Sequence, residues 1–162
     1  MPRMTNIDEL LDFSYQVRSL IIQDQGIMAL IANDPEYDPD GEDAEKYEAQ
    51  VKDHNYVDET TLEANAYVVI ETEMSSLDSP TMGTMYVYVT VILSKKYMDL
   101  DPRLFKGMKG NRRDNIARRI NLLLNNNRDF GVGDLHLTSA TIGSVPTGFT
   151  ARVLAYRVPT YA

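Results

Sequence analysis

The sequence contains neither cysteine nor tryptophan among its 162 residues. Without cysteine there are no disulfide bonds, thiolate metal sites, iron–sulfur clusters or thiol nucleophiles. Histidine occurs only at His54 and His136, so a metal site or catalytic triad would have to recruit distant segments. No apolar run approaches the roughly 20 residues that span a bilayer, and the N-terminus lacks a signal-peptide pattern. We therefore expect a soluble, intracellular protein that is not an enzyme and binds no metal or cofactor.

Two ligand-binding motifs are also missing. No glycine-rich turn of the phosphate-binding type joins a strand to a helix, which argues against a nucleotide site. Glu36, Asp38, Asp40 and Gly41 match the first ligand positions of an EF-hand loop, but Tyr47 stands where the bidentate glutamate belongs. A solvated acidic loop is the favoured interpretation, and adventitious cation binding is the alternative.

Charge is distributed unevenly along the chain, whose net charge is −8. Residues 33–60 hold eleven carboxylates against Lys46 and Lys52, whereas residues 95–119 hold nine basic residues against three aspartates. Oppositely charged regions on one small protein indicate complementary contacts between copies or with partners.

The composition, 43% apolar and 25% charged, is that of one globular domain over residues 1–162. Apolar residues at helical spacing predict a helix of about 18 residues that starts near Asn6, with a short second helical segment at 27–32. The apolar stripe of the first helix consists of Ile7, Leu10, Leu11, Ser14, Val17 or Arg18, and Ile21. Residues 33–62 form a long acidic insert, in which a brief helix near Ala44 is compatible with the spacing.

Strand-forming residues follow in two pairs. The runs 66–73 and 85–93 predict one hairpin, the second run being apolar on both faces and hence central. Asn111 predicts the start of another helix, which Asn125 to Asn127 weaken and Gly131 stops. The runs 135–142 and 149–158 predict a closing hairpin, with Phe149, Ala151, Val153 and Ala155 on one face. The order α-β-β-α-β-β favours an α+β fold in which helices pack on one side of a four-stranded antiparallel sheet.

The basic stretch offers an alternative function, because its charges are suited to phosphate contacts. Against this, Arg112 and Arg119 are expected on the polar side of the second helix, and the acidic chain would repel DNA at long range. We therefore expect no direct DNA contact, while a DNA-associated adaptor remains the rival. An enzyme would need a deep pocket around His136 with converging carboxylates.

The element order resembles that of tail-terminator or tail-completion (neck) proteins of long-tailed bacteriophages. The resemblance runs through residues 24–31 (DQGIMALI), 65–70 (NAYVVI) and 85–92 (MYVYVTVI), the helix from Asn111 and the closing strands. It covers the chain apart from the insert, which is longer than in that family. Other phage neck components share similar folds.

The resemblance implies a structural virion protein in the tail or neck, assembled in the host cytoplasm. It implies a homohexameric ring that caps the tail tube and presents a surface to the head-side connector or stopper protein. The loop tips at 74–84 and 142–148 would touch neighbouring rings, and the insert would lie on the rim. The candidate interface residues are Lys95, Lys96, Arg103, Lys106, Lys109, Arg112, Arg113, Asp38, Asp40, Glu42, Asp43, Ser79, Met82 and Pro146.

Overall fold

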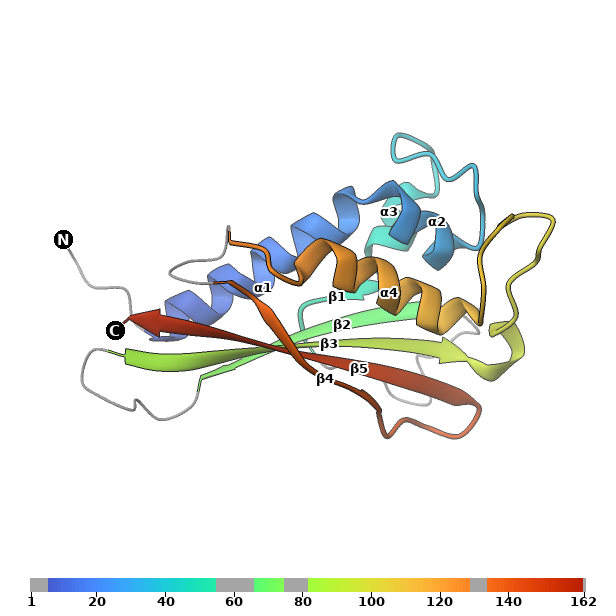
Figure 1. Ribbon diagram of the computed structural model, residues 1–162. Coiled ribbons are helices and arrows are strands. Elements are labelled where there is room, and N and C mark those ends of the chain that lie inside the picture. Colours follow the sequence, from blue (N-terminus) through green and yellow to red (C-terminus); the bar gives the residue numbers. More distant parts are fainter. Residues whose placement is uncertain (1–5, 55–65, 75–81, 129–133, 162) are drawn as a thin grey trace.

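The protein is built from one five-stranded sheet with its helices on one face, as the computed structural model shows (Figure 1). The structure describes residues 6–54, 66–74, 82–128 and 134–161. The helices are α1 (Asn6–Gln23), α2 (Gln25–Ala32), α3 (Ala44–Glu48), the 3-10 turn η1 (Lys95–Tyr97) and α4 (Arg112–Leu124). The strands are β1 (Val51–Lys52), β2 (Ala66–Met74), β3 (Met82–Ser94), β4 (His136–Ile142) and β5 (Phe149–Tyr161).

The strands lie in the order β1-β2-β3-β5-β4, so β3 is central, as its apolar character predicts. The pairs β2–β3, β3–β5 and β5–β4 are antiparallel, which confirms the two hairpins. The prediction of four strands is wrong, because β1 adds a fifth strand that runs parallel to β2. Two residues are too few to show the alternation that identifies a strand in a sequence.

The main core lies between the helices and the inner face of the sheet. Alternate residues of β3 point to this face and are fully buried: Met85, Val87, Val89, Val91 and Leu93. The helices contribute Val17, Ile21, Ile27, Leu30, Ile116, Ile120 and Leu124, which have no exposed surface. Apolar residues at every second position of a strand line one face of the sheet, and apolar residues repeated every 3.6 positions line one side of a helix. The core forms where these two apolar surfaces pack together.

The helix boundaries follow local capping signals. The side chain of Asn111 accepts a hydrogen bond from the amide of Asp114 at 2.8 Å, so α4 begins where the sequence predicts. Asp24 caps α2 in the same way, through the amide of Ile27. Asn33 adopts the left-handed conformation, with φ 57°, that ends α2. Gly131, the predicted end of the last helix, lies outside the described residues.

The acidic insert is more than a solvated loop. Its described part, up to residue 54, contains the predicted short helix as α3 and also β1. Tyr37, Ala44 and Val51 are buried in the main core. Arg18 of α1 donates hydrogen bonds to the carbonyl oxygens of Glu48 and Val51, at 3.1 and 2.8 Å. Apolar residues spaced among the carboxylates therefore anchor the insert in the core, and Arg18 joins it to α1. The many carboxylates make this apolar signal hard to see in the sequence.

The outer face of the sheet carries a second, smaller cluster. Tyr67, Val69, Ile92 and Ala151 are buried there, beneath Val145 of the β4–β5 connection and beside Phe149. In the strand register Ala151 lies opposite Ile92, Val153 opposite Thr90 and Ala155 opposite Tyr88. This register confirms the predicted shared face of β5.

Candidate functional site

The basic connector between β3 and α4 contains five of the predicted interface residues. Lys95, Lys96, Arg103, Lys106 and Lys109 are all exposed. Arg103 forms an ion pair with Asp101 at 3.1 Å, whereas none of the four lysines has an ion pair with any residue that the structure describes. The lysine charges are thus available to a partner.

Arg112 differs from the other predicted basic residues because it is only 3% exposed. Its Nε and Nη2 donate hydrogen bonds of 2.7 Å to the carbonyl oxygens of Leu30 and Ile31 in the last turn of α2. Burial lowers the pKa of Arg112 to about 10. The prediction that Arg112 lies on the polar side of its helix is wrong, since its guanidinium satisfies helix-end carbonyls inside the protein.

Arg113 is also buried and contributes to an internal charge cluster. It donates to Asp114 at 3.0 Å and to the hydroxyl of Thr150, while Arg152 donates to Asp114 at 3.0 Å. Burial opposes ionisation of Asp114, but hydrogen bonds from Arg113, Arg152 and Asn111 outweigh it and hold its pKa well below the usual range. The cluster fastens α4 to β5, so Arg113 is largely hidden from a partner.

The acidic candidates Asp38, Asp40, Glu42 and Asp43 lie exposed in the segment between α2 and α3. Asp38 accepts a hydrogen bond from the amide of Asp40 at 2.9 Å, which shapes the turn. Within the described ranges, no group of three aspartate, glutamate or histidine residues is arranged to hold a metal ion.

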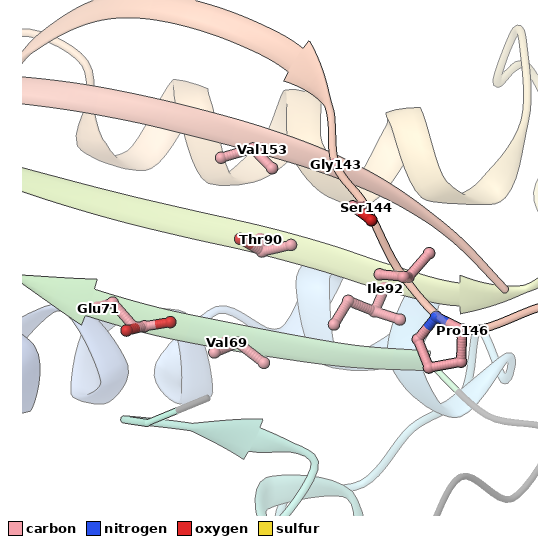
Figure 2. Close-up of a pocket in the computed structure, with 9 residues that line it drawn as sticks. Val69, Glu71, Thr90, Ile92, Gly143, Ser144, Pro146 and Val153 are labelled. Atoms are coloured by element: carbon pink, nitrogen blue, oxygen red, sulfur yellow. The ribbon is translucent and has the colours of Figure 1, made fainter. Parts of the chain in front are cut away.

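The remaining candidates lie near the strand ends. Ser79 is outside the described residues, as is the side chain of Met82. Pro146 lines a cavity of about 200 Å³ on the outer face, where Figure 2 shows the β4–β5 connection crossing over β3 and β2. Its polar lining includes Glu71, Thr90 and Ser144. His136 is exposed on β4 and lines neither this cavity nor the groove described below.

Most of the exposed large apolar side chains among the described residues lie on α1, α4 and β4, a feature that sequence reasoning missed; Tyr97 and Leu104 lie in the basic connector. On α1, Ile7 is 64%, Leu11 64% and Tyr15 71% exposed, so the prediction that Ile7 and Leu11 belong to the core stripe is wrong. Leu122 of α4 is 69% and Ile142 of β4 is 73% exposed. The sequence does contain a signal for the α1 surface: Ile7, Leu11 and Tyr15 are spaced four residues apart, which places them on one side of the helix, next to the core residues.

A groove of about 250 Å³ lies between α4 and the edge strand β4. Its apolar lining comes from Ala117 of α4 and from Leu137, Ala140 and Leu154 of the strands. Its polar lining comes from Asp114, Arg118, Asn121 and Arg152. Such a groove suits an apolar side chain flanked by charge better than it suits a reacting substrate, because it is shallow and open to solvent.

Residues 24–158 match the family model YomW. No curated protein matches the chain. In the described portion of the chain, no helix has both the length and the apolar character that crossing a bilayer requires.

Proposed function

This chain belongs to YomW, a phage-derived family of the Bacillus prophage type, and we propose that it is a structural virion protein that assembles into a ring. The ring ends the tail tube and joins it to the head-side connector. The observation that carries the proposal is the exposed apolar flank of α1 on one side of the sheet and the groove between α4 and β4 on the other.

Exposed large apolar side chains scattered singly need no explanation, but clusters of them mark interaction sites. Here Ile7, Leu11 and Tyr15 share one side of α1, and among the described strands β4 pairs with β5 alone. An open edge strand is a template for association with another chain. Surfaces at opposite edges allow each copy to contact two neighbours, as a closed ring requires.

The charged segments support a second docking surface on the same molecule. The hydrogen bonds of Arg112 to Leu30 and Ile31 join the start of α4 to the end of α2. The acidic segment 34–43 and the basic connector 95–111 therefore emerge from one end of the helical layer (Figure 1). Charges concentrated at one end suit recognition of a charged partner, such as the tube or the connector.

Light scattering coupled to size-exclusion chromatography, with negative-stain electron microscopy, tests the proposal. We expect the purified protein to form rings, either alone or on purified tail tubes of its phage. A strictly monomeric protein that leaves tube length unchanged would sink the idea. Tubes assembled with the protein should be capped at one end and shorter than tubes assembled without it.

A second candidate is a neck component whose channel contacts DNA, which the exposed lysines of the basic connector favour. Its test is fluorescence anisotropy with duplex DNA at increasing salt. Phosphate contacts make the affinity fall steeply with salt, and replacing Lys96 and Lys106 by alanine reduces the logarithmic slope by about 1 for each phosphate that is no longer bound. No measurable binding at low salt would exclude this candidate.

A further inference from the structure

We propose that the apolar flank of α1 in one copy binds the groove between α4 and β4 of the next copy, so that the copies join head to tail. This inference rests on the proposed ring, for which it supplies the contact. The occupant of the groove is a second copy of this chain, and its contacting residues are Ile7, Leu11 and Tyr15.

The apolar flank of α1 lies on the side of the sheet that carries β1. Ile7, Leu11 and Tyr15 are four residues apart and therefore share one side of the helix. Arg18 follows on the same side and reaches the carbonyl oxygen of Val51 in β1. The flank thus lies above the β1 and β2 edge, where the three side chains remain exposed.

The groove lies at the opposite edge of the sheet. Asn121 of α4 accepts a hydrogen bond from the hydroxyl of Tyr156 in β5 at 3.0 Å, and Asn125 accepts one from the amide of Leu137 in β4. These contacts place α4 over β5 and β4, on the far side from α1. Leu122 of α4 and Ile142 of β4 are also exposed, but neither lines the groove.

Charge favours this pairing over a symmetric one. Asp8 and Asp12 accompany the apolar flank, and residues 6–17 contain no basic side chain. Arg118 lines the groove, is exposed and has no ion pair with any described residue. Two α1 flanks facing each other would oppose carboxylates, whereas an α1 flank in the groove brings carboxylates to Arg118.

The arrangement in the sheet determines the kind of assembly. Each copy carries one flank and one groove at opposite edges, so the contact is heterologous and leaves an unused surface of each kind at the ends of any short chain of copies. Addition continues until the ends meet. A closed ring satisfies every flank and every groove.

Two single substitutions test the contact. Leu11→Asp damages the flank, and Ala140→Asp damages the groove that Ala140 lines. Both positions are exposed enough for the monomer to fold, which circular dichroism and thermal melts verify. We expect each variant to associate about a hundredfold more weakly than the wild type in sedimentation velocity. Gln16→Asp, an exposed change on α1 outside the apolar flank, is the matched control and should assemble normally.

Mixing the two variants distinguishes a heterologous contact from a symmetric one. The Leu11→Asp copy retains its groove and the Ala140→Asp copy retains its flank, so the mixture should form a species of two chains while each variant alone stays monomeric. Restoration of assembly by combining Asp12→Arg with Arg118→Asp, each disruptive alone, is the second expected result.

The outcomes separate this contact from the proposed function. Normal assembly of Leu11→Asp and Ala140→Asp would overturn the contact while leaving a ring intact. If the wild type forms rings that never cap a tail tube, and both variants fail to assemble, the contact would be supported and the tail function contradicted. A wild type that stays monomeric at all concentrations, with or without tubes, would contradict both.

Discussion

The two faces of the sheet differ in what covers them. The inner face lies under α1, α2 and α4. The five inward residues of β3 from Met85 to Leu93 are fully buried. The outer face carries Tyr86 and Tyr88, stacked with ring centroids 6.4 Å apart and partly exposed, and among the described residues the β4–β5 connection covers the end near Ile92. We therefore expect most of the stability to reside in the inner face.

Neighbouring residues of β3 give the sharpest test of this difference. Leu93 is fully buried on the inner face, and Ile92 is 3% exposed under the connection on the outer face. Leu93→Ala should lower the free energy of unfolding by about 4 kcal/mol, because rigid helices cannot collapse into the cavity. Ile92→Ala should cost about 2 kcal/mol, because the connection can settle inward. Urea titration measures both, and equal losses would contradict the comparison.

The helical layer over the inner face depends on Arg112. Arg112→Met keeps most of the buried chain but removes both donors to the carbonyl oxygens of Leu30 and Ile31. We expect a loss of about 2 kcal/mol in the free energy of unfolding. Lys109→Met, an exposed change nearby, should alter it by less than about 0.5 kcal/mol. A neutral Arg112→Met would mean that the buried charge costs as much as its hydrogen bonds contribute.

The Asp114 cluster links α4 to the sheet and makes part of the stability depend on pH. Because the folded-state pKa of Asp114 is lowered, its contribution is complete above its ordinary pKa and is lost as the pH falls below that value. Asp114→Asn should cost about 1.5 kcal/mol at neutral pH, since 38% exposure of the side chain weakens the pairing. The difference from the wild type should shrink below about pH 4 in acid titrations.

The smallest expected effects come from removing one tyrosine hydroxyl on each face of the sheet. The hydroxyl of Tyr156, on the inner face, donates to Asn121 at 3.0 Å, and burial raises its pKa. The hydroxyl of Tyr88, on the outer face, donates to Glu73 at 3.3 Å near solvent. Tyr156→Phe should cost about 1 kcal/mol and Tyr88→Phe less than about 0.5 kcal/mol in urea titrations. The reverse order would show that the outer face is the better-packed one.

The candidate site can be predicted from the sequence only in part. The exposed lysines of the basic connector are evident because surface charge is visible as composition. Arg112 and Arg113 fall into the same group, since a buried arginine has the same sequence signature as an exposed one. Periodicity assigns the apolar flank of α1 to the core, because Ile7 and Leu11 lie beside Leu10 and Ser14 in the helical pattern.

Local sequence is sufficient to predict the strand pairs, the start of α4 at Asn111 and the central place of β3. These features arise from side-chain periodicity and local capping, which act over a few residues. The parallel pairing of β1 with β2, the burial of Arg112 and the exposure of Leu11 are visible only in the folded protein. Each of these three features depends on which distant segments pack beside the residues concerned. That packing is determined when the helices dock on the sheet.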